Sequence, residues 1–225
     1  MYNYSSLSSL DIDKLQSRNR SELINKLSGF KSPVLIGTCG NSCVNNLSII
    51  SSLFHIGSNP PLLGFVLRPP SSEYSHTYKN IISSQQFTIS HVHSEIIKKA
   101  HRCSAKFPGH ISEFESVGLT PFINKIRNWI APAVLESKTR VGLVLNSKIE
   151  LPNRCVLIVG EIKWIDSSEF SFKEDKVHFE TNDISVVGLY DYYKSHKLFQ
   201  LGYEHYEDIQ ASEGSMFYNP KTSQS

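Results

Sequence analysis

The stretch NNLSIISSLFHIGSNPPLLGFVLRPPSSEYSHTYKN, residues 45–80, decides how the rest of the chain can be interpreted. Its apolar and β-branched residues predict two strands, one at 47–56 and one at 62–67. Between them, GSNPP at 57–61 predicts a turn, because proline has no N–H to give to a strand pair and glycine adopts turn conformations readily. The pattern then changes to that of a short helix at 77–84.

The strand pattern recurs on both sides of this stretch. Strand-length apolar runs occur at PVLIGTC, residues 33–39, and at 87–92, 141–149 and 155–165, with a weaker one near 186–189. These strands outnumber the helices, and the connections between them are short. The sequence therefore predicts a mainly β fold, a small closed antiparallel β-barrel with peripheral helices.

Helical patterns lie at the periphery of the predicted barrel. Apolar spacing at 11–28 predicts two helical segments, and the composition of 95–105 is also helical. Residues 106–133 contain three prolines and little steady period, which indicates a long excursion with short helical turns. Excursions of this length inside a compact domain are usually functional.

The chain length suits a single domain. We expect the 225 residues to form one domain over 1–206, with 1–28 as its N-terminal helical segment. Residues 207–225 are polar and lack periodicity, so we expect a flexible tail.

Composition argues against several classes of partner. With 23 basic and 21 acidic residues the formal charge is +2, which gives no field that favours nucleic acid. The longest apolar runs are far shorter than the ~20 residues of a membrane helix. The N-terminus shows no recognisable secretion signal and the four cysteines are scattered, so we expect reduced thiols and a cytoplasmic protein.

Several other residues invite functional roles that their context does not support. His91 and His93 share one strand face, but no carboxylate or cysteine at a suitable spacing completes a metal site, so none is expected. Trp129 is typical of core packing. Glu113 and Glu115, in the sequence SEFES, are interpreted as exposed loop carboxylates.

The hydroxyl groups around the first strand pair suggest a phosphorylated ligand. A phosphate monoester needs several hydrogen-bond donors and usually a cation, because a dianion taken from water must be compensated. Ser48, Ser51, Ser52 and Thr77 can supply donors, and Arg68 follows directly after an apolar strand. The alternative is an ordinary surface arginine with serines that fill tight turns.

The order of these motifs resembles the flavin reductase-like domain family, whose members are FMN-binding split barrels similar to flavoredoxin. The resemblance rests on NNLSIISSLFHIGSNPPLLGFVLRP and HTYKNI, and on the flanking segments KLSGFKSPVLIGT, KAHRCSAKFPGHISEFESVGLTP and VLIVGEI. These segments are collinear over roughly residues 20–200. One difference is the turn GNSCVNN, where many relatives have a D-x-x-G hairpin.

The resemblance implies FMN as the cofactor and assigns its site. The flavin would lie along residues of the first strand, with phosphate contacts from Arg68 and Thr77. Asn80 would cap local structure, and two residues of a loop at the substrate side are further candidates. The complete implied set is Asn46, Ser48, Ile49, Ser51, Ser52, Arg68, Thr77, Asn80, Ser104 and Lys106.

The resemblance further implies an oxidoreductase that transfers hydride from NADH or NADPH to flavin, as a homodimer and with a possible partner oxygenase. A bound flavin carries the chemistry, so no catalytic pair of side chains is expected. No G-x-G-x-x-G motif follows a strand, so the nicotinamide would stack transiently on the flavin. One alternative is a flavin-binding electron carrier without strong NAD(P)H turnover. Another is a barrel that has lost flavin and serves as an interaction module.

Overall fold

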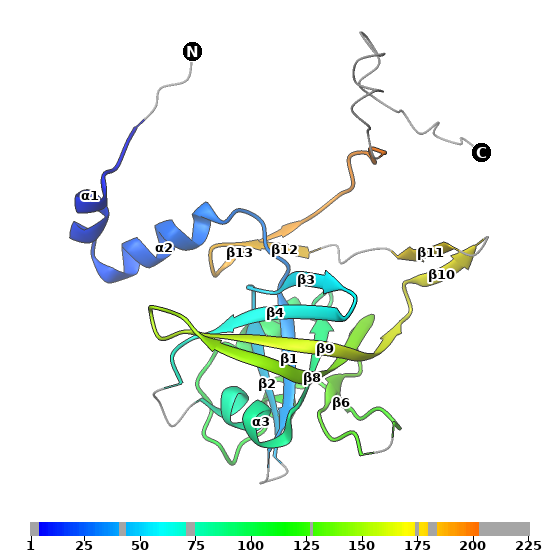
Figure 1. The fold of residues 1–225 in the computed structure, drawn as a ribbon. Coiled ribbons are helices and arrows are strands. Elements are labelled where there is room, and N and C mark those ends of the chain that lie inside the picture. The colour runs from blue at the N-terminus through cyan, green and yellow to red at the C-terminus, as the bar shows by residue number, and fades with distance from the viewer. Residues whose placement is uncertain are drawn as a thin grey trace. The chain divides into compact units, whose positions relative to one another are not determined.

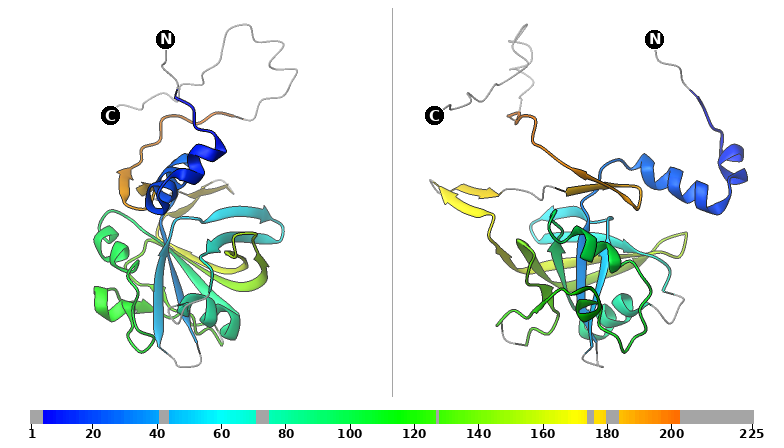
Figure 2. Two further views of the ribbon diagram at one scale, coloured as in Figure 1. Left: turned by 90° about the vertical axis from the view of Figure 1, so that its left-hand side faces the viewer. Right: turned by 180° about the vertical axis from the view of Figure 1, so that it is seen from behind.

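A computed structural model describes residues 5–40, 44–70, 75–126, 128–173, 176–179 and 184–202 (Figures 1 and 2). The chain divides into two compact units, residues 1–194 and 195–225. In the second unit the described residues, 195–202, form neither helix nor strand. The predicted tail at 207–225 lies outside the described residues.

The first unit is built on one antiparallel sheet of seven strands, in the order β2-β1-β5-β8-β9-β4-β3. This arrangement confirms the predicted mainly β fold. The strands are β1 (Val34–Cys39), β2 (Asn45–Ile50), β3 (Phe54–Ser58), β4 (Pro61–Leu67), β5 (Gln86–His91), β8 (Thr139–Glu150) and β9 (Val156–Ser167).

The single strand predicted at 47–56 is wrong, because β2 and β3 are separate strands at opposite edges of the sheet. Only residues 51–53 connect them, so the sheet must curl until its two edges approach each other. The Ser52 hydroxyl stabilises this link, since it accepts from Val66 N–H at 3.0 Å and donates to Val66 C=O at 3.2 Å. The curled, incompletely paired sheet is a split barrel.

The barrel interior holds the main hydrophobic core. Phe65 and Phe87 meet edge to face at its centre, with ring centroids 5.6 Å apart. Burial of apolar side chains here supplies the main driving force for folding. The buried members are Val34, Ile36, Phe65, Ile81, Phe87, Ile89, Val141, Leu143, Val156 and Ile158.

The helices are peripheral to the barrel, as predicted, and α1 and α2 bury no residue. The predicted segments at 11–28 are α1 (Ser9–Lys14) and α2 (Ser17–Leu27), and the predicted helix at 77–84 is α3 (His76–Ser84). The excursion at 106–133 contains one short helix and two short strands. The remaining elements here are α4 (Ile97–Arg102), α5 (Glu113–Val117), β6 (Pro121–Phe122) and β7 (Ala133–Val134).

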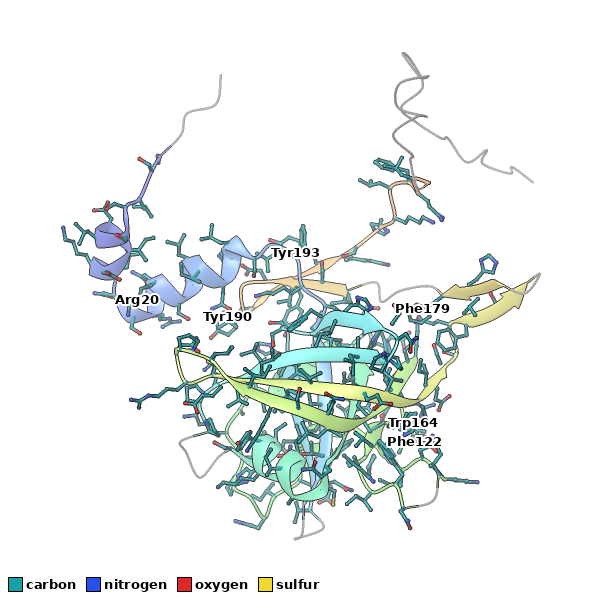
Figure 3. All side chains as sticks on the ribbon, in the orientation of Figure 1. Arg20, Phe122, Trp164, Phe179, Tyr190 and Tyr193 are labelled. Atoms are coloured by element: carbon teal, nitrogen blue, oxygen red, sulfur yellow. The ribbon has the colours of Figure 1, made fainter. Side chains whose placement is uncertain are left out.

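A second core lies outside the sheet, between β2, α4 and α5. Leu35 and Leu47 from the strands are fully buried against Phe114 of α5 and Ala100 of α4. A third, smaller cluster at β9 pairs Trp164 with Trp129, whose ring centroids are 5.5 Å apart. Figure 3 shows Trp164 on the same side of the barrel as Phe122, a partly buried residue that packs against this cluster.

Two hairpins follow the barrel: β10 (Phe170–Lys173) with β11 (Lys176–Phe179), and β12 (Ile184–Val187) with β13 (Asp191–Lys194). The strand predicted near 186–189 therefore begins and ends earlier. The second hairpin is attached to the segment that follows α2 (Figures 1 and 2). Lys31 and Val186 exchange two backbone hydrogen bonds, and Lys26 forms an ion pair with Asp191 at 3.3 Å.

Candidate functional site

A cleft of about 900 Å³ opens beside the edge strand β2. Its walls come from β2, the end of β4, the start of α3, the loop after α4, α2 and the hairpin β12–β13. All of the predicted site residues except Asn80 line this cleft. They are Asn46, Ser48, Ile49, Ser51, Ser52, Arg68, Thr77, Ser104 and Lys106.

The outer edge of β2 faces the cleft with its backbone. In an antiparallel pair, residues alternate between pointing their N–H and C=O at the neighbouring strand and pointing them away. Asn45 C=O accepts a hydrogen bond from Ser112, and Leu47 N–H donates to Glu113, so residues 45 and 47 point away from β1. By the same alternation Ile49 also directs its N–H and C=O outward, away from its β1 partner Leu35. Ile49 thus offers the cleft one donor and one acceptor.

Asn46 and Thr77 are joined beneath the cleft. The Asn46 amide donates to Thr77 Oγ1 at 3.1 Å and to Thr38 Oγ1 at 3.0 Å, and the Asn46 side chain is buried. Because Thr77 Oγ1 accepts this bond, its own proton is still available to a ligand. Asn46 therefore holds α3 against β2. Thr77 is the polar group of α3 that can bind a ligand in the cleft.

Asn80 lies outside the large cleft. Its amide donates to Thr38 Oγ1 at 3.2 Å, and its side chain packs so closely on Gly40 that a Cβ there would overlap it. Asn80 lines a separate, much smaller depression with His76 and Gly109. The Asn80 side chain therefore joins α3 to β1 outside the cleft.

The serines differ in how far their hydroxyls are already used. Ser52 is bonded to the backbone of Val66, as described above. Ser48 and Ser51 are half-buried at the cleft and form no side-chain hydrogen bond with any described residue. Their hydroxyls are therefore the more available donors.

Positive charge borders the cleft. Arg68 directly follows β4, is exposed, and forms no hydrogen bond or ion pair with the residues that the structure describes. Lys106 and Ser104 lie on the exposed loop after α4. Arg68 and Lys106 can therefore compensate an anionic group held in the cleft.

The interpretation of Glu113 as an exposed loop carboxylate is wrong. Its exposed fraction is 6%, and it lines the cleft while accepting the Leu47 N–H bond at 3.0 Å. Burial raises the pKa of the Glu113 carboxyl above its ordinary value, and the bond from Leu47 opposes that rise. The sequence did carry a signal, because SEFESVGL places Phe114 and Val117 on one apolar helix face beside it.

An aromatic wall closes one end of the cleft, and sequence reasoning missed it. His101 Nδ1 lies 2.9 Å from the Tyr192 hydroxyl, and the His101 ring meets Tyr190 with centroids 6.1 Å apart. Tyr190 and Tyr192 come from the hairpin, where Figure 3 labels Tyr190. The run LYDYY, residues 189–193, was the available signal, but nothing local indicated which part of the barrel it would reach.

The described residues show neither a metal-binding cluster nor a membrane-spanning helix. No group of three or more His, Cys, Asp and Glu side chains within that part of the chain is placed to hold a metal ion. None of the helices that the structure describes has the length and apolar character needed to span a membrane.

Comparison with known proteins gives the fold a family. A crystal structure of a protein assigned as a flavin reductase with split barrel domain, from Shewanella frigidimarina NCIMB 400, matches with a TM-score of 0.82 and 36% identity. The match covers 89% of this chain and 100% of that one. Nitrilotriacetate monooxygenase component B from Bacillus cereus matches with a TM-score of 0.77 over 89% of this chain and 100% of its own. Its identity is 20%, so this likeness shows the fold alone.

Sequence comparison agrees with the structural match. A curated relative from Aquifex aeolicus (strain VF5), an uncharacterized protein, is 27% identical over 104 residues, or 46% of this chain. The chain spans about half the length of that relative, 52%. The model of the flavin reductase like domain matches residues 27–182. The chain therefore belongs to the flavin reductase-like domain family.

Proposed function

We propose that the protein binds FMN and transfers hydride from NADH or NADPH to flavin. The observation that carries this proposal is the cleft. There an outward-facing strand edge lies near Arg68 and the Ser48 and Ser51 side chains, which have no hydrogen-bond or ion-pair partner among the described residues. In a chain of the flavin reductase-like domain family, this set matches what a phosphorylated ring cofactor needs.

The donor set fits the two ends of an FMN molecule. A ring edge with both hydrogen-bond donors and acceptors would find the N–H and C=O of Ile49. A phosphate monoester would find the Arg68 guanidinium and the hydroxyls of Ser51 and Thr77. A guanidinium binds a phosphate strongly because it presents several N–H groups in a fixed fork. A cofactor with a single terminal phosphate, FMN, accounts for all of these groups.

The protein's part in the reaction is to position its reactants. A bound flavin supplies the hydride-accepting ring. Within the cleft, the Glu113 carboxylate already accepts a hydrogen bond from Leu47 N–H. The Asn46 amide already donates to the hydroxyls of Thr38 and Thr77. These groups fix the walls, and holding two reactants in a productive geometry can itself supply much of the rate acceleration.

The aromatic wall supports a transient second reactant. His101, Tyr190 and Tyr192 present flat rings and one imidazole–hydroxyl pair to the cleft. Such rings favour offset or edge contacts with another planar ring, worth about 0.5–1.5 kcal/mol beyond the area buried. A nicotinamide ring that enters, reacts and leaves requires contacts of this modest strength.

The test separates three outcomes. The purified chain is titrated with FMN, FAD and riboflavin by flavin fluorescence, and the FMN complex is then mixed anaerobically with NADH or NADPH. We expect a yellow complex, tightest with FMN, whose visible absorbance bleaches on reduction within about seconds at ordinary enzyme turnover. A yellow complex that neither nucleotide bleaches would favour an electron carrier. A chain that binds no flavin would refute the proposal.

The proposal also covers the protein's oligomeric state, its cellular compartment and its partner. We expect a homodimer, which is supported by apolar side chains exposed on β3, where Phe54 is 43% and Ile56 40% exposed. The three described cysteines, Cys39, Cys103 and Cys155, are free thiols, which supports a reducing compartment such as the cytoplasm. Reduced flavin needs an acceptor, and we propose a partner oxygenase for that role.

A further inference from the structure

The edge strand β2 carries backbone groups that no neighbouring strand can pair. An edge strand normally leaves such N–H and C=O groups to water or to another chain. Here two adjacent side chains satisfy two of them. Ser112 Oγ donates to Asn45 C=O at 2.7 Å, and Glu113 Oε2 accepts from Leu47 N–H at 3.0 Å.

These two side chains are held rigidly. Ser112 is the N-cap of α5 and Glu113 is its first residue. Phe114 and Val117 of the same helix are 0% and 5% exposed in the second core, where they pack with Leu47. The helix therefore acts as a fixed support for the Asn45–Leu47 part of β2.

The support ends where the cleft begins. Past Leu47 the next outward-facing groups are those of Ile49, and no described side chain is bonded to them. The strand is continuous, so fixing residues 45 and 47 also fixes the position and direction of the Ile49 N–H and C=O two residues later.

We propose that Glu113, assisted by Ser112, is a positioning residue that holds the outer edge of β2 so that Ile49 can bind the polar edge of the flavin ring. The inference rests on the proposed function and deepens it. Glu113 acts through Leu47 and need not touch the flavin. A carboxylate suits this task because a hydrogen bond to a charged acceptor is shorter and stronger than one to a neutral acceptor.

The experiment compares Glu113→Ala, Glu113→Gln and Ser112→Ala in the full chain. Glu115→Ala is the matched control, because that carboxylate lies on the same helix but is exposed. For each variant the FMN dissociation constant, the absorbance spectrum of bound FMN and the thermal midpoint are measured. Amide hydrogen exchange of the peptide that contains β2 is measured without ligand.

We expect Glu113→Ala to weaken FMN binding by up to about tenfold, because the charge-assisted bond that is lost goes to Leu47 and affects FMN only through the position of Ile49. The spectrum of bound FMN should shift, and exchange in β2 should accelerate. Glu113→Gln keeps an acceptor oxygen and should recover most of the affinity. Ser112→Ala should show a smaller loss, and Glu115→Ala none.

The results also separate this inference from the proposed function. Wild-type affinity and an unshifted spectrum in a folded Glu113→Ala variant would overturn the positioning role and leave FMN binding intact. A wild-type chain that binds no flavin would overturn both. If Glu113→Ala does not fold, Ser112→Ala decides the question. Wild-type FMN affinity together with wild-type exchange in β2 would then refute the positioning role of Glu113 and Ser112.

Discussion

Arg68 provides the sharpest test of the site at the scale of single residues. It is exposed and has no partner among the described residues, so Arg68→Ala should leave the free energy of unfolding almost unchanged. A charge-assisted hydrogen bond is worth about 1.5–3 kcal/mol, so FMN affinity should fall by about ten- to hundredfold. Riboflavin lacks the phosphate, and its affinity should be unchanged. Fluorescence titration with both ligands measures the difference.

The control for this variant is Arg102→Ala, which removes an exposed arginine at the end of α4 that does not line the cleft. Equal FMN affinity in the Arg68→Ala and Arg102→Ala variants would remove Arg68 from the site. Equal losses for FMN and riboflavin would instead place Arg68 near the ring.

Cys103 should be chemically inert although it lines the cleft. Burial raises the pKa of its thiol to about 12, and the Glu113 carboxylate contributes to the rise. At pH 8 only about one thiol in 10,000 would then be ionised, and the thiolate is the reactive form. Iodoacetamide followed by peptide mass spectrometry should label the half-buried Cys155 well before Cys103. Labelling of both at the same rate in the native protein would contradict this expectation.

Single-residue roles could be predicted only in part. The resemblance placed Ile49 at the flavin, but the register of β1 with β2 was needed to see that its backbone faces the cleft. Glu113 was misjudged because its burial depends on α5 packing against β2, and these elements lie more than sixty residues apart in the chain. Local sequence patterns report on amphipathic faces but not on which distant element covers them.

At the scale of elements, the break between β2 and β3 shows a limit of pattern reasoning. Residues 47–56 read as one continuous strand because Ser51 and Ser52 interrupt the apolar pattern only briefly. The break is imposed by closure of the sheet, which needs a short link between its two edges. The bond of Ser52 to Val66 is a tertiary contact that spans 14 positions.

The strand β1 should tolerate no side chain at Gly37. A Cβ built there would overlap the backbone carbonyl of Pro132 and crowd the Thr88 hydroxyl. Since a backbone carbonyl cannot rotate away, Gly37→Ala should lower the free energy of unfolding by about 1–3 kcal/mol or more. Urea unfolding followed by tryptophan fluorescence measures this change.

Gly57→Ala is the matched control on β3. A Cβ there would meet only the Pro60 carbonyl, at an ordinary contact distance of 3.6 Å. Its cost should stay well below that of Gly37→Ala. Indistinguishable urea midpoints for the two variants would show that the segment around Pro132 can move away from β1.

At the scale of the whole molecule, the barrel could be predicted from the sequence, but the hairpin that forms one wall of the cleft could not. Alternating apolar strands with short turns determine an antiparallel barrel almost by themselves. The hairpin β12–β13 is held at the cleft by contacts with segments distant in the chain, among them the paired backbone bonds of Lys31 and Val186. These contacts join regions about 150 residues apart, and no local pattern encodes them.

The division of the chain leads to a final prediction. Every described residue that lines the cleft lies at or before Tyr192, within the first compact unit. Beyond His196, the described residues 197–202 are exposed, so removing them uncovers little apolar surface. A chain that ends at His196 keeps β13 intact and two residues beyond it. This truncated chain should keep the thermal midpoint and FMN affinity of the full chain, measured by circular dichroism and fluorescence titration. A marked loss of affinity with an unchanged midpoint would mean that the removed residues contribute to the cofactor site.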